Sequence, residues 1–291
     1  MKIKNLVMIL TLGAATMSCA NSAKQETKTN YADLTKQYAK VQLTSDISHL
    51  SDNEKQMLDY LYEIGNIMDD IFWTQQFGGD KEAFLNSIED KDARLFAEIN
   101  YGPWNHFDNL NPFLPEYGAM PAGAGFYPTD MTKEEFEAWE NPDKTSLYTL
   151  IKRDENGKLQ AVWYHEAYAE QINRVAELLN KAADLAGDKE FADYLRLRAK
   201  AVLTDDYFES DMAWMDVRNN NVDFVVGPIE NYVDALYGYK AAHEAFILIK
   251  DQAWSKQLAR YAELLPLLQT QLPVAEEYKQ EKPGADADLA V

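Results

Sequence analysis

The stretch from Val222 to Asp251 constrains the fold most, because strand-like runs and turn-forming residues alternate along it. It opens with Val222 to Val226, an apolar run whose length and β-branched residues suit a strand. We expect the following Gly227-Pro228 step to end the regular strand, since proline cannot donate a ladder hydrogen bond. A second strand-like run extends from Ala245 to Ile249. The stretch therefore predicts a small antiparallel sheet.

Three polar residues follow the Gly-Pro step at a spacing of two: Glu230, Tyr232 and Asp234. Residues two apart in an extended chain project from the same face. This spacing predicts a phenol that lies between two carboxylates. The alternative is that the two acids cap the ends of helices or strands while the tyrosine packs with its hydroxyl satisfied.

Helical patterns dominate the rest of the chain. Ser51 and Glu54 form a capping box, and apolar residues then recur at steps of three and four until Gly78-Gly79. Thr132 and Glu135 form a second capping box, whose helix should end at Asn141-Pro142. The apolar stripe of the first helix consists of Met57, Leu61, Ile64, Met68 and Ile71.

Other segments are assigned from the same signals. A hairpin is expected from 147–152 and 159–164, on either side of Asp154-Glu155-Asn156-Gly157. We expect this hairpin and the stretch from Val222 to Asp251 to build the one small antiparallel sheet together. The helix after it, which ends at Gly187, should be the longest. Residues 101–128 form an aperiodic loop, either ordered near a cleft or pinned to the surface by its aromatic residues. Further helices are expected at 81–88, 92–100, from Asp188 to about Val202, and at 254–272 with a kink or a new start at Pro266.

The N-terminus carries a targeting signal. Residues 1–19 have two early lysines, an apolar run and small residues before Cys19, as in a lipoprotein signal peptide. We expect Cys19 to be lipidated; plain secretion, with Cys19 in the discarded piece, is the alternative. Residues 20–45 are polar and predict a flexible tether, and residues 46–291 form the body. The expected location is the bacterial cell envelope, periplasmic or at the cell surface, with the membrane contacted only through the lipid anchor.

Composition excludes one class of partner. The formal net charge of -20 and the lack of a basic cluster argue against binding of nucleic acid. The excess of acids either keeps the protein soluble or draws cationic ligands toward a site. The acidic segment 205–216 has the same two interpretations: it binds a metal or a cation, or it solvates a helix whose aromatic residues are buried.

The central motif and several others resemble the dipeptidyl peptidase III family of zinc peptidases. The pattern E-x-Y-x-D at Glu230, followed by E-A-F-I from Glu244 to Ile247, is similar to the segment that precedes the family's metal motif. The resemblance covers most of the chain from about Ser45 to Pro273. Further pieces resemble the shorter bacterial members: Gly102-Pro103-Trp104, Asn111-Pro112-Phe113, Phe126-Tyr127-Pro128, Glu134 to Trp139, Asp206-Tyr207-Phe208 and Asp211 to Met215.

The resemblance implies roles for individual residues. Glu230 would bind the free ammonium of a short peptide, and Tyr232 would hydrogen-bond the scissile carbonyl and stabilise the oxyanion in catalysis. Asp234, Glu244 and Phe246 match the motif without an assigned role. The implied fold is α+β and predominantly helical with a small antiparallel sheet, similar to the N-terminal, lower lobe of the family.

The metal motif of the family is missing. Neither His165-Glu166 nor His243-Glu244 is followed by a histidine at the spacing of H-E-x-x-H, and the other histidines are His49 and His106. We therefore expect no metal ligands and no cofactor in this chain, although zinc is implied for a complete enzyme. The resemblance covers the N-terminal part of the family and stops before the catalytic one.

Two functional hypotheses follow. In the first, the chain is the N-terminal part of a zinc-dependent dipeptidyl peptidase III-like hydrolase, and a catalytic C-terminal half is its missing partner. In the second, it is a stand-alone, non-catalytic lipoprotein that binds short peptides with a free N-terminus. Both predict that the chain alone has no peptidase activity.

Overall fold

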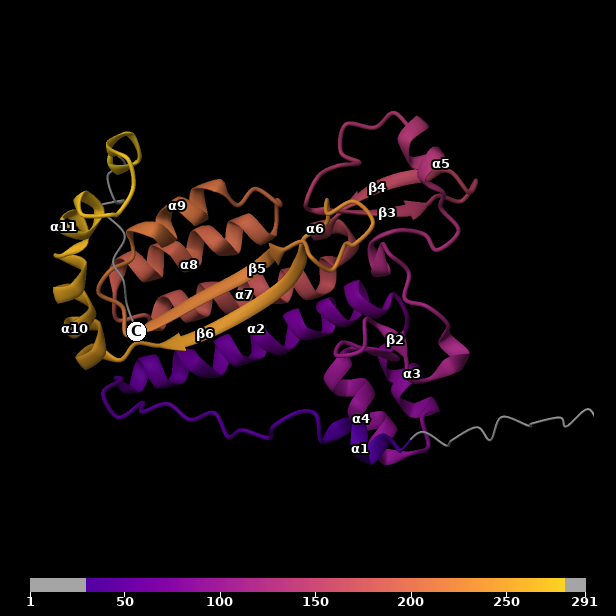
Figure 1. Ribbon diagram of the computed structural model, residues 1–291, viewed down its shortest axis with the longest axis horizontal. Coiled ribbons are helices and arrows are strands. Elements are labelled where there is room, and N and C mark those ends of the chain that lie inside the picture. The colour runs from indigo at the N-terminus through magenta and orange to yellow at the C-terminus, as the bar shows by residue number, and fades with distance from the viewer. Residues whose placement is uncertain (1–29, 281–291) are drawn as a thin grey trace, which may run out of the picture. The chain divides into compact units, whose positions relative to one another are not determined.

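The computed structural model describes residues 30–280, a largely helical body with three separate two-stranded antiparallel sheets (Figure 1). The expected signal peptide and Cys19 lie outside the described residues. Within 30–280 no helix is both long and apolar enough to cross a membrane. The helices are α1 (Tyr31–Thr35), α2 (Asp52–Phe77), α3 (Lys81–Ser87), α4 (Lys91–Asn100), α5 (Lys133–Ala138), α6 (Tyr164–Ala167), α7 (Ala169–Leu185), α8 (Lys189–Val202), α9 (Phe208–Asp216), α10 (Gln252–Ala262) and α11 (Leu265–Thr270). The strands are β1 (Trp104–Asn105), β2 (Asn111–Pro112), β3 (Thr149–Arg153), β4 (Leu159–Trp163), β5 (Val222–Glu230) and β6 (Ala242–Ile249).

Helix α2 organises the body. Its predicted capping box is present, because the Ser51 hydroxyl accepts from the Glu54 backbone and the Glu54 carboxylate accepts from the Ser51 backbone. The apolar stripe is buried, and Gly78 ends the helix in the left-handed conformation with φ 78°. With 26 residues it is longer than α7, which has 17 and ends at Leu185, so the prediction that the helix after the hairpin is the longest was wrong.

The main core lies between α2, the α7–α8 pair and the β5–β6 hairpin, which runs alongside α2 in Figure 1. Two buried tyrosines tie the layers together. The Tyr194 hydroxyl on α8 donates to the Phe224 carbonyl on β5 at 2.6 Å, and the Tyr164 hydroxyl donates to the Ala241 carbonyl at 2.9 Å. A hydrogen bond at each end thus fixes the position of the hairpin over the helices.

Strand β5 continues through Gly227-Pro228, contrary to the prediction that this step ends it. Gly227 adopts φ 130°, and the register with β6 shifts between Pro228 and Glu230. Proline is tolerated because, among residues 30–280, β5 pairs with β6 alone, and a bulge follows directly. The hairpin β3–β4 was correctly predicted, but it forms its own sheet and does not join β5–β6 as expected.

A second, smaller core packs beside the C-terminal half of α2. It contains Trp73, Phe84, Phe96 and Phe113, with side chains from α1 against it. The Tyr38 hydroxyl donates to Asn100 Oδ1 at 3.0 Å. Residues 31–38 of the predicted 20–45 tether are therefore packed on the body, since their two tyrosines find aromatic partners here.

The loop 101–128 is ordered and packed. Strands β1 and β2 pair within it, and Trp104 Nε1 donates to the Gly118 carbonyl at 3.0 Å. At Gly125 the loop touches the last turn of α2 so closely that a Cβ would lie 2.3 Å from the Thr74 carbonyl oxygen. Only glycine permits this approach. The contact holds the loop against the helix end that carries Gln75 and Gln76.

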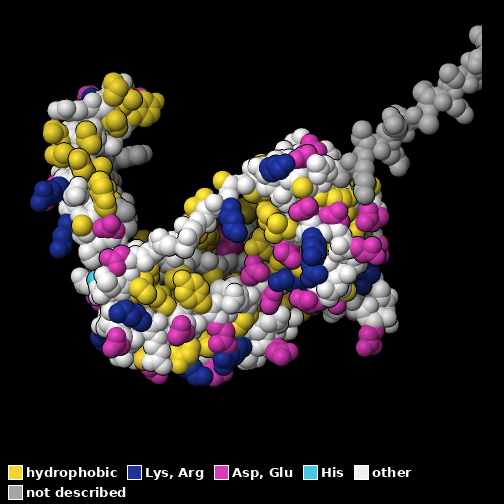
Figure 2. All heavy atoms as spheres, turned by 90° about the horizontal axis from the view of Figure 1, so that it is seen from below, with side chains coloured by type: hydrophobic (Ala, Val, Ile, Leu, Met, Phe, Trp, Pro, Cys, Tyr) yellow, Lys and Arg dark blue, Asp and Glu magenta, His cyan; other side chains and the backbone are white. Residues whose placement is uncertain are grey.

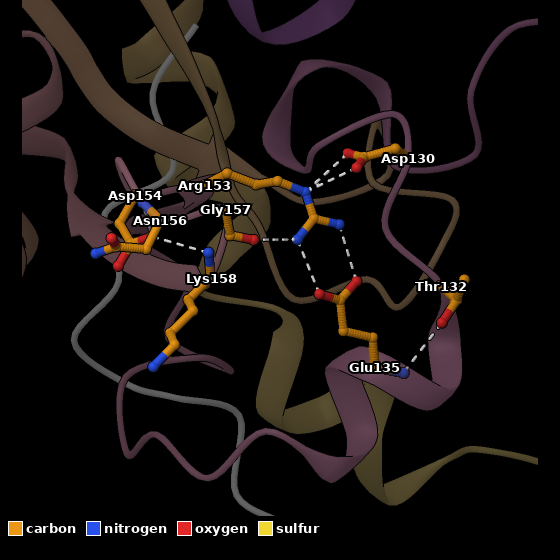
Figure 3. A network of polar contacts seen from close by, with 8 residues as sticks. All are labelled: Asp130, Thr132, Glu135, Arg153, Asp154, Asn156, Gly157 and Lys158. Carbon is orange, nitrogen blue, oxygen red and sulfur yellow. Dashed lines mark hydrogen bonds and ion pairs between the residues drawn. The ribbon is translucent and has the colours of Figure 1, made fainter.

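Helix α5 and the β3–β4 hairpin are joined by one arginine (Figure 3). Arg153 donates to both oxygens of Glu135 at 2.8 and 2.9 Å, and to both oxygens of Asp130 at 3.0 and 2.8 Å. Thr132 caps α5 as predicted, but the Glu135 carboxylate binds Arg153 instead of completing the box. The helix ends at Ala138, three residues before the predicted Asn141.

Large apolar side chains are exposed on α9, α10 and α11. In and just before α9, the expectation that the aromatic residues of 205–216 are buried holds for Tyr207 but fails for Phe208, which is 72% exposed, and for Trp214, which is 39% exposed. A second helix begins near Pro266 as predicted. Figure 2 shows hydrophobic side chains gathered along α10 and α11. The exposed ones from this region on are Trp254, Tyr261, Leu264, Leu265, Leu267, Leu268, Leu272, Val274 and Tyr278.

Candidate functional site

The three residues of the E-x-Y-x-D motif do not share one face. Glu230 ends β5 and is exposed, and Tyr232 is 67% exposed in the turn that follows. Asp234 is 2% exposed and points into the protein. The prediction of a common face was wrong because the chain leaves the extended conformation after Glu230 and turns.

Asp234 holds this turn together. The Tyr127 hydroxyl donates to its Oδ2 at 2.7 Å, and both carboxylate oxygens accept from backbone groups of the turn. Burial, together with the Asp234 carboxylate, raises the pKa of Tyr127, which keeps this phenol protonated as a donor. The acid of the motif is therefore an internal anchor. The backbone donors are the N–H groups of Leu236, Tyr237, Tyr239 and Lys240, at 2.9 to 3.2 Å.

Tyr232 nevertheless lies near two carboxylates, Glu230 and Glu244. Burial first, and then the charges of Glu244 and Glu230, raise the pKa of Tyr232. Burial and the charge of Glu230 likewise raise the pKa of Glu244. Glu244 Oε2 is buried and accepts no hydrogen bond from the part of the chain that is described. Sequence reasoning named all three residues but paired the phenol with the wrong second acid.

A pocket of about 250 Å³ opens beside these residues. Its α2 side includes Asp69, whose Oδ1 accepts from the Tyr101 hydroxyl at 2.6 Å. The motif residue Phe246 lines it with half of its side chain exposed. Because Asp69 and Glu244 are both acids, the pocket has an anionic lining. The complete lining is Gly65, Asp69, Phe72, Tyr101, Tyr232, His243, Glu244, Ala245 and Phe246.

A second pocket of about 360 Å³ also has Tyr232 in its wall. The loop 101–128 and the turn after β5 supply most of its lining, which is mainly apolar. Tyr232 is the residue that both pockets share. The exposed phenol therefore stands where an anionic pocket and an apolar pocket meet.

Two consecutive glutamines on α2 each contact a histidine: Gln75 contacts His243 in the anionic pocket, and Gln76 contacts His106 in the apolar pocket. Gln75 Oε1 accepts from the His243 backbone N–H at 2.8 Å, so its Nε2 must donate to His243 Nδ1 at 3.0 Å. His243 consequently carries its proton on Nε2, and burial lowers its pKa to about 3. Gln76 Nε2 lies 3.3 Å from His106 Nε2 in the apolar pocket, and burial lowers the pKa of His106 as well. Both histidines are neutral near pH 7.

Sequence reasoning missed these glutamines, although a signal was present. The stripe Met57, Leu61, Ile64, Met68, Ile71 continues in phase to position 75, which is glutamine. A polar residue in the phase of a buried stripe must find a buried partner. Asp69 and Tyr101 had no comparable signal, because their pairing depends on how the loop folds back.

The donors of the described chain do not fit a zinc ion. Residues 30–280 contain no group of three or more His, Cys, Asp or Glu side chains that could hold a metal. The histidine of each His-Glu pair has another partner, since His165 Nδ1 lies 2.7 Å from Asp205 Oδ2 and His243 is bound by Gln75.

The chain matches known proteins over most of its described length. A model of peptidase family M49 matches residues 131–285. The structure of DPP III from Caldithrix abyssi superimposes with a TM-score of 0.79 at 37% identity, over 85% of this chain and 49% of that one. Dipeptidyl-peptidase III from Corallococcus sp. strain EGB gives a TM-score of 0.78 at 32% identity, over 89% and 50%.

A curated relative is Nudix hydrolase 3 of Arabidopsis thaliana, 30% identical over 303 residues, which cover 83% of this chain and 39% of the relative. The chain therefore spans half or less of the length of the proteins it matches. The superpositions confirm the predicted fold class, α+β and mostly helical.

Proposed function

This chain belongs to peptidase family M49, and from that premise we propose that it supplies the peptide-binding part of a zinc-dependent dipeptidyl peptidase III-like hydrolase. M49 is a metallopeptidase family, and the resemblance expected from the sequence is confirmed. The relatives are about twice as long as the part matched here. We therefore propose the relatives' activity only for a complete enzyme that contains this chain. The alternative proposal is that the chain is a stand-alone lipoprotein, which would bind peptides at the same site.

The observation that carries the proposal is the pair of carboxylates beside the exposed Tyr232. Glu230 and Glu244 are close enough for the charge of Glu230 to raise the pKa of Glu244. A buried oxygen of Glu244 still has acceptor capacity that the described residues do not use. The ammonium of a free peptide N-terminus is a cation with three donors, and it would relieve the repulsion between the acids.

Tyr232 suits the second role that the resemblance implies. Its raised pKa keeps the phenol protonated at neutral pH, and its exposure leaves the O–H free to reach a bound peptide. A neutral O–H donates to a peptide carbonyl and would stabilise negative charge that develops on that oxygen. When bound in a complete enzyme, zinc would supply the activated water, and the described residues of this chain do not provide its ligands.

Calorimetric titration of a tetrapeptide tests the binding role. The free peptide should bind roughly tenfold to 100-fold more tightly than its N-acetylated form, because a hydrogen bond to a charged group contributes about 1.5–3 kcal/mol. The Glu230→Gln and Glu244→Gln variants should each bind the free peptide more weakly, and their affinity for the acetylated peptide should be unchanged. Glu82→Gln, an exposed residue of α3 that lines neither pocket, is the matched control. Equal affinity for both peptides would rule the proposal out.

The same proposal predicts no turnover by this chain alone. Incubation with zinc and a dipeptidyl arylamide should release no arylamine, since three metal donors do not converge within 30–280. Arylamine release that a chelator abolishes would overturn this part.

We also propose the partner that covers α10 and α11. Their exposed leucines would be unusual on a free surface, and the matched structures are about twice as long as the matched part. The occupant we assign is the remaining part of an M49 fold. Adding the unmatched part of the Caldithrix abyssi protein should give a 1:1 complex by light scattering, which Leu265→Asp with Leu268→Asp should abolish. No complex with the unsubstituted chain would refute this assignment.

Attachment to the cell envelope through Cys19 stays a proposal, since that residue lies outside the described part. Labelled fatty acid should enter the wild-type protein and not the Cys19→Ser variant. Labelling of both would place the anchor elsewhere.

A further inference from the structure

We propose that the apolar pocket beside Tyr232 receives an apolar side chain of the bound peptide and so selects which peptides bind. The inference rests on the proposed function, because it assumes a peptide held by its ammonium near Glu230 and Glu244. It adds a substrate class: peptides with a leucine-like or phenylalanine-like residue among their first three positions.

The lining of the pocket carries the chemistry. Leu110, Pro112, Met120 and Val233 supply an apolar lining around a volume of about 360 Å³. This volume lies at the small end of the range for ligand pockets, so it suits one side chain with its backbone. A charged side chain placed there would lose its hydration without a partner of opposite charge, since none of the described residues that line the pocket is Lys, Arg, Asp or Glu.

The backbone at the rim is held in an uncommon conformation. Asn109 has φ 50° and Leu110 has φ 59°, in the left-handed region that a bulky residue such as leucine rarely adopts. The Leu110 N–H donates to the Asn105 carbonyl at 3.0 Å, and the Asn111 N–H donates to the Asp108 carbonyl at 2.9 Å. These bonds hold a turn that places Leu110 in the pocket lining, and such strain is typical of ligand-contacting segments.

Tyr232 connects the apolar pocket to the ammonium site, since it lines both pockets. An extended peptide advances about 3.3 Å per residue. A peptide that starts in the anionic pocket and passes the phenol therefore brings one of its first residues to the apolar pocket.

The test uses the purified chain and a set of free-amine tetrapeptides that differ at one position at a time. At one of positions 1 to 3, the peptide with leucine should bind at least about tenfold more tightly than the peptide with aspartate, because the pocket removes the leucine side chain from water. Met120→Asp and Ala122→Asp should remove that preference. Ala122 is exposed, so its variant should fold even if the first does not. Ala83→Asp, at an exposed alanine of α3 outside both pockets, should keep the preference.

The outcomes separate this inference from the proposed function. If acetylation weakens binding but leucine and aspartate bind equally at every position, the apolar pocket does not select peptides and the ammonium site stands. If the preference survives both pocket variants, the selecting surface lies elsewhere and the inference fails. If no peptide binds, the proposed function fails and this inference fails with it.

Discussion

Replacement of Gln75 by leucine probes the polar contact at the centre of the site. Gln75 is fully buried and makes two hydrogen bonds to His243, one to the backbone N–H and one to Nδ1. Leucine leaves both groups buried without a partner, at about 1–3 kcal/mol each, so we expect a loss of about 2–6 kcal/mol in the free energy of unfolding. A loss of this size is a large part of the stability of an ordinary domain.

A double-mutant cycle isolates the contact. His243→Phe removes Nδ1 but keeps the backbone donor, so the double variant leaves only that one donor unpaired and should lose about 1–3 kcal/mol. The double variant should therefore be less destabilised than the sum of the two single variants. Urea unfolding followed by circular dichroism at pH 7 measures all three. Gln56→Leu, on an exposed position of α2, is the control and should change stability by less than about 0.5 kcal/mol. Strict additivity, or a Gln75→Leu variant as stable as this control, would refute the reasoning.

Two further predictions concern neighbouring groups. The pKa of His243 is lowered from 6.5 to about 3, so the unfolded chain binds a proton that the folded chain does not, and stability should fall as pH drops through this window. The contribution of this group to the free energy of unfolding should change by up to about 1.4 kcal/mol per pH unit. Urea unfolding of the wild type and of His243→Phe from pH 7 to 5 should show this difference in slope. Parallel curves of unfolding free energy against pH would contradict the assignment. Asp234→Ala leaves the Tyr127 hydroxyl and four backbone donors without their acceptor, and should lose at least about 3 kcal/mol in thermal or urea unfolding. Tyr232→Phe should lose less than about 0.5 kcal/mol, because the hydroxyl is on an exposed side chain; a comparable loss in both variants would count against the anchor role of Asp234.

Local signals predicted the helices well. The capping box at Ser51, the stripe from Met57 to Ile71 and the stop at Gly78 define α2 without any long-range information. The cap at Asp188 and the hairpin signal around Gly157 were equally sufficient. These features succeed because each depends on residues within one or two turns of one another.

The candidate site could be predicted only in part. Glu230, Tyr232 and Glu244 were named from the sequence, whereas the relation between them depends on a turn that Asp234 closes with backbone donors up to six residues away and with the distant Tyr127 hydroxyl. The pairing of Gln75 with His243 joins residues 168 positions apart, which no periodicity reveals. The Gly-Pro step was misjudged for a related reason: whether a strand tolerates proline depends on how its two edges are paired.

In the turn that follows β5, the residue that maintains the backbone conformation and the residue available to a ligand are different ones. The acid at its base is committed to internal hydrogen bonds, whereas the aromatic residue at its tip contributes little to the core. Natural variation or engineering could therefore exchange the side chain at position 232 for another reactive or recognition group while the loop keeps its course. A substitution at position 234 would instead alter every residue that the loop carries.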